Sequence, residues 1–317
     1  MPIKERVKVA CIGAGNVGAA VAQYCAEMEV GNIVLFDVVE GMPQGKALDL
    51  MQAAPTRDYS TRIVGTNDYR DIAGSDICVV TAGLARKPGM TRLDLLEKNG
   101  RIMTEICEKI RNYAPHATVI IVTNPLDVMV YLAEHVLEFE PRRVMGMAGI
   151  LDSSRMSTFV ALELGVSLRS VQTMVLGSHG DNMVPLPDYT TVAGISITNL
   201  LPTEKIEELV QRTRQGGGEI VKLLKTGSAF YAPGASAARM VEAIVRDEKC
   251  VLPCAGYLTG QYGLQDIYMG VPCVLGRKGV ENIIELNIAE TDLKALHKSA
   301  EDVQKGIDDL KKMHLID

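Results

Sequence analysis

Polar side chains that could bind a small anion or move a proton follow apolar segments at several places in this sequence. Asn124 comes after the run ATVIIV, Asp152 and Arg155 stand in LDSSR, and His179 stands in GSHGD. A guanidinium group can bind a carboxylate at two points, and an imidazole titrates near neutral pH. Because open α/β sheets bind ligands beyond the carboxyl ends of their strands, we expect these side chains to line one site.

Residues 81–96, TAGLARKPGMTRLDLL, form a further group of this kind. The stretch contains Arg86, Lys87 and Arg92, although the chain as a whole has a net charge of −6. A solvated surface loop is one interpretation, and a loop that binds an anion is the other. The Gly and Pro residues indicate a flexible loop after a strand, able to close over a ligand.

The Asp152–Arg155 pair and His179 each have a structural interpretation that must be weighed against a chemical one. Asp152 and Arg155 would share a helix face, where an ion pair contributes only ~0.2–0.5 kcal/mol. His179 stands out from the other histidines because it follows a strand and has glycine neighbours. The other histidines are His116, His135, His297 and His314.

The segments that must position these residues alternate between strand-like and helix-like patterns in the first half of the chain. The predicted strands are 7–12, 32–36, 77–81, 117–122 and 143–147, and the predicted helices are 17–28, 43–54 and 93–113. Apolar strands without alternation, separated by helices, predict a parallel sheet that is covered on both faces.

The second half reads differently. It predicts a helix after Asp152, a strand at 171–176, helices at 204–224 and 235–245, antiparallel ribbons at 250–258 and 268–275, and a last helix that packs on its own domain. We therefore expect an α/β protein, with a Rossmann-type doubly wound parallel sheet followed by an α+β substrate or catalytic domain. The expected boundaries are 1–148 for the nucleotide-binding domain and 149–317 for the catalytic domain.

The stretch GAGNVG follows the first predicted strand and opens the first predicted helix, which is the context that a GxGxxG dinucleotide motif requires. Gly13 permits the tight turn, Gly15 lets the backbone approach a pyrophosphate, and Gly18 lets the helix pack closely. Asp37 ends the next strand, where its carboxylate can accept both ribose hydroxyl groups and would repel a 2′-phosphate. NAD is therefore favoured over NADP, although a glycine-rich turn without a ligand is the alternative. The residues expected to hold the cofactor are Gly13, Gly15, Asn16, Val17, Gly18 and Asp37.

The composition excludes several classes of function. Hydrophobic residues make up 47% of the 317-residue chain and charged residues 23%, as in ordinary soluble globular proteins. The acidic balance without a basic patch argues against nucleic acid, and no apolar run reaches the ~18 residues of a membrane span. The segment MPIKERVKVACIG has no apolar h-region, which argues against a signal or transit peptide. The odd count of seven cysteines suits reduced thiols, so we expect a cytoplasmic protein. Cys250 and Cys254 have no histidine near them, and we predict no metal site.

The order of the motifs resembles that of the lactate/malate dehydrogenase family over essentially the whole chain. The motifs that carry this resemblance are GAGNVG, the strand-terminal Asp37, ARKPGMTR, TNP, LDSSR and GSHGD. The pattern is most similar to the lactate-dehydrogenase-like malate dehydrogenases of bacteria and archaea. Ala85 departs mildly from that pattern, where the family often has proline. The resemblance implies reversible oxidation of (S)-malate to oxaloacetate with NAD, as in the tricarboxylic acid cycle. It also implies a homo-oligomer, a tetramer (a dimer of dimers) being favoured over a dimer.

The resemblance also implies a role for each polar residue. His179 would carry the substrate's hydroxyl proton, and Asp152 would fix the imidazole tautomer and stabilise the imidazolium. Arg155 would hold the C1 carboxylate in a two-point fork. Arg92 would polarise the carbonyl in the transition state.

Other residues of the motifs are implied in binding. Asn124 would bind substrate and cofactor, and the remaining cofactor residues would be Asn99, Val122 and Thr123. The family places arginine at the position of Arg86 in malate enzymes and commonly glutamine in lactate enzymes. A charge pair at 4 Å is worth ~4 kcal/mol at an effective dielectric constant of ~20 and ~1 kcal/mol in water, which is about five- to a thousandfold in selectivity. Arg86 therefore predicts malate as the substrate.

Three alternative functions remain open from the sequence. The protein could be an L-lactate dehydrogenase or another 2-hydroxy-acid dehydrogenase. NAD-dependent glycosidases share this kind of nucleotide domain, but they are expected to need metal ligands, for which we find no convincing cluster. A redox sensor that binds NAD without turnover would have no need for a proton carrier.

Overall fold

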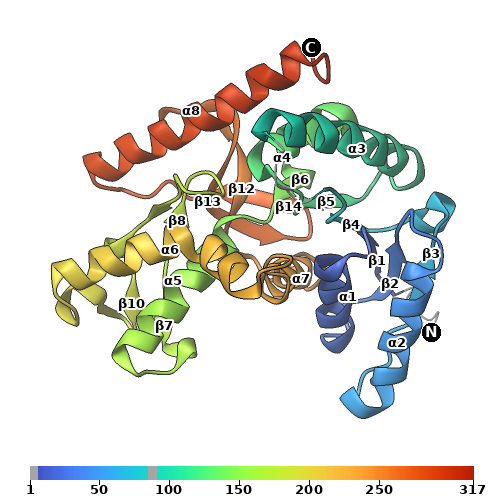
Figure 1. The fold of residues 1–317 in the computed structure, drawn as a ribbon, viewed down its shortest axis with the longest axis horizontal. Helices are drawn as coiled ribbons and strands as arrows, with labels where there is room; N and C mark the ends of the chain where they lie inside the picture. Colours follow the sequence, from blue (N-terminus) through green and yellow to red (C-terminus); the bar gives the residue numbers. More distant parts are fainter. Residues whose placement is uncertain (1–5, 85–90) are drawn as a thin grey trace.

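A single nine-stranded sheet forms the centre of the protein, with the strand order β14-β13-β12-β6-β5-β4-β1-β2-β3. The structure is a computed structural model that describes residues 6–84 and 91–317. Helices cover both faces of the sheet (Figure 1), as the fold class predicted from the sequence requires. None of the helices in these described ranges is long and apolar enough to cross a membrane.

The first half of the chain supplies six parallel strands. They are β1 (Lys8–Ile12), β2 (Asn32–Phe36), β3 (Ile63–Thr66), β4 (Ile77–Val80), β5 (Thr118–Ile121) and β6 (Val144–Gly146). β1 pairs in parallel with both β2 and β4, so the order of the strands reverses between β1 and β4. This reversal creates the crevice in which doubly wound sheets bind nucleotides.

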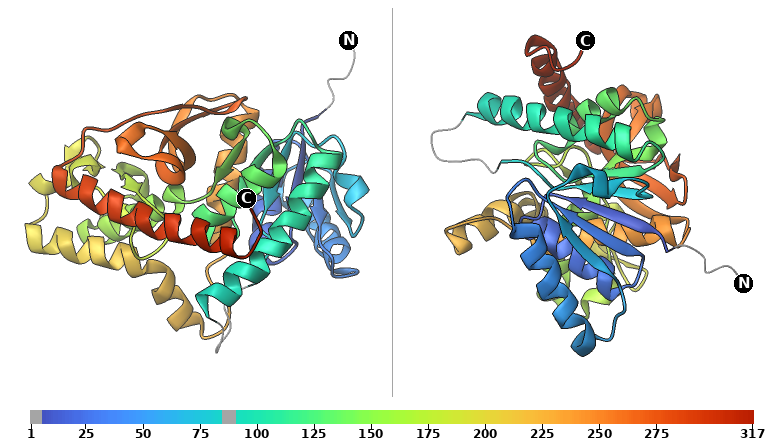
Figure 2. Two further views of the ribbon diagram at one scale, coloured as in Figure 1. Left: turned by 90° about the horizontal axis from the view of Figure 1, so that it is seen from above. Right: turned by 90° about the vertical axis from the view of Figure 1, so that its right-hand side faces the viewer.

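The helices form one layer on each side of this sheet. Those of the first half are α1 (Asn16–Glu27), α2 (Met42–Arg57), α3 (Arg92–Tyr113) and α4 (Leu126–Leu137). α1 and α2 cover one face together with α7 (Tyr231–Val245), and α3 and α4 cover the other together with α8 (Glu290–Lys312), as Figures 1 and 2 show. The predicted doubly wound arrangement is confirmed.

Three strands of the second half extend the same sheet. They are β12 (Cys250–Thr259), β13 (Gln265–Gly276) and β14 (Gly279–Ile283). They pair antiparallel with one another, and β12 joins β6 through Ala255 and Gly146. The predicted antiparallel ribbon is confirmed, and one cluster of buried apolar residues includes side chains from both halves.

The rest of the second half is a smaller lobe built on α5 (Gly149–Leu164) and α6 (Thr203–Leu224). Its short strands are β7 (Val171–Gln172), β8 (Val175–Leu176), β9 (Val184–Pro185), β10 (Thr191–Val192) and β11 (Ile195–Ser196). A second, smaller apolar cluster fills this lobe and includes Met156, Val175 and Leu209.

The segment 171–176 is not the continuous strand that we predicted. β7 pairs with β10, whereas β8 pairs with β9 in a different sheet. Thr173 lies between them, and its hydroxyl donates to the Ser153 carbonyl at 2.7 Å. This hydrogen bond to α5 directs the backbone away from the β7–β10 pair before the β8–β9 pair begins.

The last helix was predicted to pack on its own domain, but it also packs on the first half. α8 contacts α3 and α4 as well as β13 and β9. It lies beside α3 in both views of Figure 2. The buried side chains of α8 include Leu296, Val303 and Leu310. Through these contacts α8 joins the two halves of the chain.

Candidate active site

The glycine-rich turn between β1 and α1 is shaped by close backbone contacts. Gly13 has a positive φ of 103°, and a Cβ on Gly18 would lie 1.8 Å from the Gly13 carbonyl oxygen. Gly15 differs, because a Cβ there would meet no described atom within 4 Å. Gly15 is the N-cap of α1, and no described side chain caps the helix at this point. The turn thus leaves open space in front of amide groups that can bind phosphate oxygens.

Asp37 stands at the end of β2, beside this turn. Its Oδ2 accepts a hydrogen bond from Ala14 N–H at 2.7 Å, and its Oδ1 accepts one from Val39 N–H at 3.0 Å. Each carboxylate oxygen can accept two hydrogen bonds, so both keep a free acceptor site for ribose hydroxyl groups. The open turn and this carboxylate fit the pyrophosphate and ribose of NAD.

Lys46 is a residue of this region that the sequence interpretation did not include. Its Nζ donates to the Ala14 carbonyl oxygen at 2.7 Å. Ala14 is therefore held by Asp37 through its N–H and by Lys46 through its carbonyl. The sequence gives no motif that identifies Lys46, because this lysine of α2 contacts a residue 32 positions earlier in the chain.

The TNP turn after β5 lies against the end of β4. Thr123 is 5% exposed, and its hydroxyl donates to Ala82 O at 2.6 Å. The N–H of Val122 donates to Val80 O at 2.8 Å. The Asn124–Pro125 peptide bond is cis.

Asn99, on α3, ties this turn to the end of the β4 segment. Its amide nitrogen donates to Leu84 O at 3.2 Å and to Asn124 O at 2.7 Å, and its Oδ1 accepts from Leu84 N–H at 2.8 Å. Asn99 is 1% exposed. Both amide hydrogens are therefore used by the main chain, and one lone pair of Oδ1 remains for another partner.

His179, Asp152 and Arg155 form a connected group. His179 Nδ1 lies 2.9 Å from Asp152 Oδ2, and Arg155 Nη1 donates to Asp152 Oδ1 at 3.1 Å. The exposed fractions of the three side chains are 15%, 2% and 13%. The ion pair between Asp152 and Arg155 that was weighed as a structural alternative does form, and the same carboxylate also holds the imidazole.

The surroundings of His179 favour its protonated form. Burial by itself would lower the pKa of the imidazole, but the Asp152 carboxylate and its hydrogen bond raise that pKa above its ordinary value. Because Nδ1 faces Asp152, Nε2 is the ring nitrogen that can exchange a proton with a ligand.

Arg155 packs against a run of glycines in α6. A Cβ on Gly216 would lie 3.1 Å from Arg155 Cδ, and one on Gly217 would lie 3.4 Å from its Nη2. Gly218, the next residue, would place a Cβ within 4 Å of no described atom. Arg155 Nε is buried and has no hydrogen-bond partner among the described residues. The absence of side chains at Gly216 and Gly217 therefore leaves space for the Arg155 side chain.

Arg92 is the first residue of α3, although the sequence interpretation placed it with Arg86 on one loop. Thr91 caps the helix in a reciprocal box with Asp94, in which the two hydrogen bonds are 2.9 and 3.0 Å long. A cation in the first turn opposes the helix dipole by roughly 0.3–1 kcal/mol, so helix stability does not explain Arg92. Arg86 lies outside the described residues.

A pocket of about 330 Å³ brings several of the predicted residues together. Arg92 from α3, Asn124 from the TNP turn and His179 all line it. Asp152 and Arg155 do not line it, but Asp152 is hydrogen-bonded to His179 Nδ1, and Arg155 is hydrogen-bonded to Asp152. Asp127 and Asp302 also line it, and the sequence interpretation did not include them. Asp127 follows TNP by only two residues, so its place in TNPLD is the one available signal.

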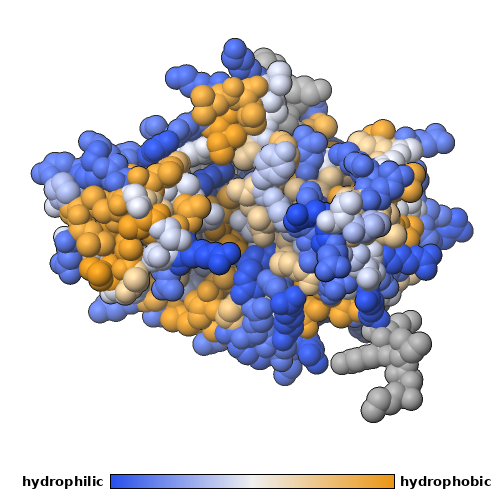
Figure 3. Space-filling model, turned by 90° about the horizontal axis from the view of Figure 1, so that it is seen from below, coloured by the Kyte–Doolittle hydropathy of each residue, from blue (hydrophilic) through white to orange (hydrophobic). Residues whose placement is uncertain are grey.

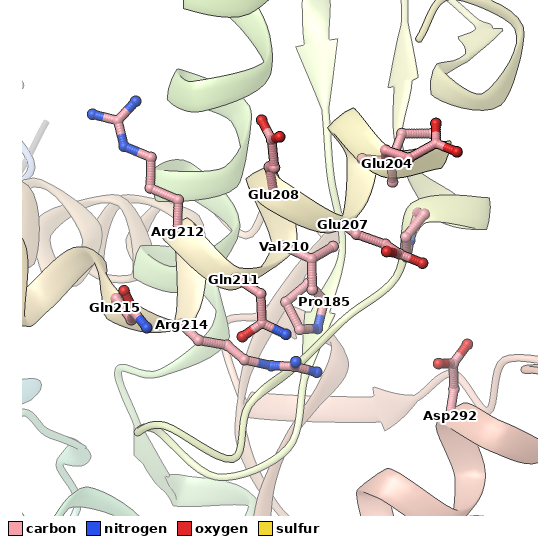
Figure 4. A pocket seen from close by; sticks show the side chains of 12 residues that line it. Pro185, Glu204, Glu207, Glu208, Val210, Gln211, Arg212, Arg214, Gln215 and Asp292 are labelled. Carbon is pink, nitrogen blue, oxygen red and sulfur yellow. The ribbon is translucent and has the colours of Figure 1, made fainter. Parts of the chain in front are cut away.

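A second pocket, of about 780 Å³, is lined by α6 together with Pro185, Pro187 and Asp292 (Figure 4). Its lining carries charges of both signs, from Glu204, Glu207, Glu208, Arg212, Arg214 and Asp292. Arg212 is already paired with Glu219 at 2.8 Å. None of the predicted site residues lines this pocket, so the chemistry points to the smaller one.

The comparison with known families assigns both halves of the chain. Residues 7–146 match the lactate/malate dehydrogenase NAD binding domain, and residues 150–314 match the lactate/malate dehydrogenase alpha/beta C-terminal domain. The chain belongs to the lactate/malate dehydrogenase family. The family resemblance and the NAD-binding fold expected from the sequence are confirmed.

Relatives within the lactate/malate dehydrogenase family cover nearly the whole chain. A malate dehydrogenase of Methanosarcina mazei is 54% identical over 304 residues, which are 96% of this chain and 99% of the relative. The solved apo malate dehydrogenase of Picrophilus torridus is 49% identical with a TM-score of 0.94, covering 97% of this chain and 99% of that one. A lactate dehydrogenase of Cryptosporidium parvum, solved with lactic acid and NAD, is 40% identical with the same TM-score, covering 98% of this chain and 99% of that one. The backbone fold therefore does not distinguish the two substrates.

Proposed function

We propose that this protein is an NAD-dependent malate dehydrogenase that interconverts (S)-malate and oxaloacetate. The observation that carries the proposal is the buried pair of His179 Nδ1 and Asp152 Oδ2, 2.9 Å apart, with Arg155 on the same carboxylate. A module that only binds NAD would have no use for such a proton carrier. The malate dehydrogenases among the relatives, at 54% and 53% identity, support the same reaction.

We propose that the residues that hold NAD follow β1, β2 and β5 along the chain, with one further residue on α3. They are Gly13, Gly15, Asn16, Val17, Gly18, Asp37, Asn99, Val122, Thr123 and Asn124. When bound, NAD supplies the hydride acceptor for malate and, as NADH, the hydride donor for oxaloacetate. The open face of Gly15 and the free acceptor sites of Asp37 support this placement.

His179 is proposed to exchange the proton that accompanies hydride transfer. During malate oxidation its Nε2 accepts the hydroxyl proton, and during oxaloacetate reduction it returns that proton to the carbonyl oxygen. Asp152 stabilises the imidazolium and fixes the tautomer that leaves Nε2 free.

Two arginines are proposed to orient the substrate. Arg155, whose Nη1 is anchored on Asp152, holds the C1 carboxylate with the rest of its guanidinium fork. Arg92 lines the pocket and stabilises negative charge on the carbonyl oxygen in the transition state. Asn124 lines the same pocket and donates a hydrogen bond to the substrate.

Malate is proposed as the substrate rather than lactate because of Arg86. Its charge would pair with the distal carboxylate of oxaloacetate, and pyruvate would leave it unpaired in a closing site. An L-lactate or other 2-hydroxy-acid dehydrogenase is the second candidate, since a lactate dehydrogenase has the same TM-score to this chain.

Replacing the proton carrier tests the proposed reaction. Wild-type protein should consume NADH when oxaloacetate is added, and His179→Asn should lower kcat by at least about 100-fold while NADH binding persists. Absence of NADH consumption by the wild type would overturn the enzymatic proposal in favour of a sensor. Unchanged turnover in His179→Asn would overturn the role of His179 alone.

The remaining expectations from the sequence are kept as proposals. We place the domain division at 1–148 and 149–317, between the end of β6 and the start of α5. We also propose a cytoplasmic enzyme of the tricarboxylic acid cycle that forms a homo-oligomer, a tetramer being favoured over a dimer. The apolar side chains that gather on one lobe in Figure 3 support contacts between copies, and the exposed ones in the second half include Leu162, Leu168 and Ile195.

A further inference from the structure

Asp127 is a buried carboxylate that the reaction described so far does not use. It lies in the first turn of α4 and is 4% exposed. Its Oδ2 accepts a hydrogen bond from the main-chain N–H of His179 at 2.8 Å. Its Oδ1 is buried and has no hydrogen-bond partner among the described residues. A buried oxygen without a partner costs about 1–3 kcal/mol, so stability alone does not explain this residue.

The hydrogen bond from His179 connects the two halves of the chain. Asp127 follows Asn124, the proposed ligand of substrate and cofactor, by three residues on the first-half side of the pocket. His179 belongs to the loop after β8 in the second half. The main chain of His179 is therefore tied through one carboxylate to the first turn of α4, just after the TNP turn.

Side chains of α8 hold the same loop without touching His179. Ser299 Oγ accepts from Ser178 N–H at 2.9 Å and lies 2.8 Å from Ser178 Oγ. Asp302 accepts from the Asn182 amide. The loop is thus anchored on both sides of His179, and Asp127 is the anchor that bonds to the main chain of His179 itself.

The charged groups around His179 come from four helices and from its own loop. Within the described residues, Asp152 and Arg155 on α5 and Asp127 on α4 act on the charge of the imidazole. Arg92 on α3, Asp302 on α8 and Asp181 on the loop line the same pocket. Asp152 and Asp127 raise the pKa of His179, and Arg155 lowers it. Burial raises the pKa of Asp127 itself to about 6, so this carboxylate is largely ionised at neutral pH.

We propose that Asp127 is a positioning residue for proton transfer, which anchors the main chain of His179 and supplies a second negative charge that stabilises its imidazolium. The proposal rests on the proposed reaction and adds a residue to it. Asp152 fixes the ring from the Nδ1 side, and Asp127 fixes the backbone from which the ring projects. Asp152 therefore orients the imidazole ring, and Asp127 places the loop that carries it.

Two substitutions separate the charge from the anchor. In Asp127→Asn the remaining oxygen can still accept from His179 N–H, and the amide nitrogen replaces Oδ1, which has no partner to lose. Ser299→Ala is the matched control, because it removes an anchor of the same loop without changing a charge. Both variants are compared with wild type by NADH binding and thermal unfolding, and then by the pH profile of kcat/KM for oxaloacetate.

The sign of the expected pH shift follows from the reaction direction. Oxaloacetate reduction needs protonated His179, so kcat/KM falls as the pH rises through the pKa of that imidazole. Removing the negative charge in Asp127→Asn should move this fall to lower pH by about 0.5–1 unit. Ser299→Ala should lower kcat or thermal stability and leave the position of the fall unchanged.

The outcomes distinguish this inference from the proposed function. If wild type does not reduce oxaloacetate, the proposed function fails. If wild type is active, and kcat/KM of Asp127→Asn falls at the same pH as that of wild type, the proposed role of the Asp127 charge is overturned. If Asp127→Asn folds but turns over too slowly for a pH profile, the pKa of the His179 imidazole is measured from the pH dependence of its carbethoxylation. The same reaction with His179→Asn gives the background from the other histidines. An imidazole pKa equal to that of wild type would overturn the inference, and a lower pKa would support it.

Discussion

His179 can exchange a proton with a ligand at only one of its two ring nitrogens, because Nδ1 is held by Asp152 at 2.9 Å. Arg92 is the first residue of α3, where the helix dipole disfavours a cation, so helix stability does not explain an arginine there. Both residues stand out from the sequence by type and motif order. Asp127 and Ser299 do not, because they act on the histidine loop through main-chain bonds that span 52 and 121 residues.

At the same scale, the two arginines of the 81–96 stretch should give different kinetic signatures. Arg86→Gln should lower kcat/KM for oxaloacetate and raise it for pyruvate relative to wild type, by about five- to a thousandfold in the ratio, because it removes the partner of the distal carboxylate. Arg92→Gln should mainly lower kcat, because its contact strengthens in the transition state. Steady-state kinetics on both substrates measure this. An unchanged substrate preference in Arg86→Gln, or a pure KM effect in Arg92→Gln, would contradict the assignments.

Among the elements, α6 shows how a helix can be adapted to a neighbouring side chain. Three consecutive glycines, Gly216–Gly218, stand inside it, where each costs about 1 kcal/mol relative to alanine. Two of them lie against Arg155, so the helix gives up local stability where it borders the proposed carboxylate fork.

Alanine substitutions in α6 should therefore separate stability from substrate binding. Gly216→Ala places a methyl group 3.1 Å from Arg155 Cδ, which should displace the guanidinium and raise KM for oxaloacetate by roughly three- to tenfold without changing NADH affinity. Gly218→Ala is the matched control, because it meets no described atom within 4 Å. It should raise Tm by a few degrees, in line with a gain of ~1 kcal/mol, and leave KM unchanged. Equal KM values in the two variants would refute this role of the glycines.

Periodicity revealed most helices but missed α4, for a physical reason. α4 reads LDVMVYLAEHVL, and it contacts α3, α8, β5, β6 and β13. A helix that is enclosed on nearly all sides is apolar on nearly all sides, so it lacks the one-faced pattern that periodicity detects. β3 and β14 are the outermost strands of the sheet and partly exposed, so they lack a continuous apolar run.

For the whole molecule, the continuous sheet and α8 join what the sequence divides into two halves. β12 pairs with β6 across the proposed boundary, and α8 packs on α3 and α4 while Ser299 holds the histidine loop. The sequence predicted the class of each half but not this continuity, because strand pairing between residues 146 and 255 leaves no local pattern.

Assembly is the prediction that belongs to this scale. Multi-angle light scattering should give a mass four times that of the chain, because apolar side chains such as Leu168, at 56% exposed, would be buried between copies. Leu168→Asp should shift the mass towards a smaller species, because it places a charge in the proposed contact. A monomer in the wild type at micromolar concentration would contradict the proposed homo-oligomer.

The most direct test of the central claim is the ratio of kcat/KM values for oxaloacetate and pyruvate, measured with NADH at one pH and one ionic strength. A malate dehydrogenase whose Arg86 pairs with the distal carboxylate should prefer oxaloacetate by at least about 100-fold, within the range that one charge pair provides. Comparable values, or a preference for pyruvate, would contradict the proposed substrate.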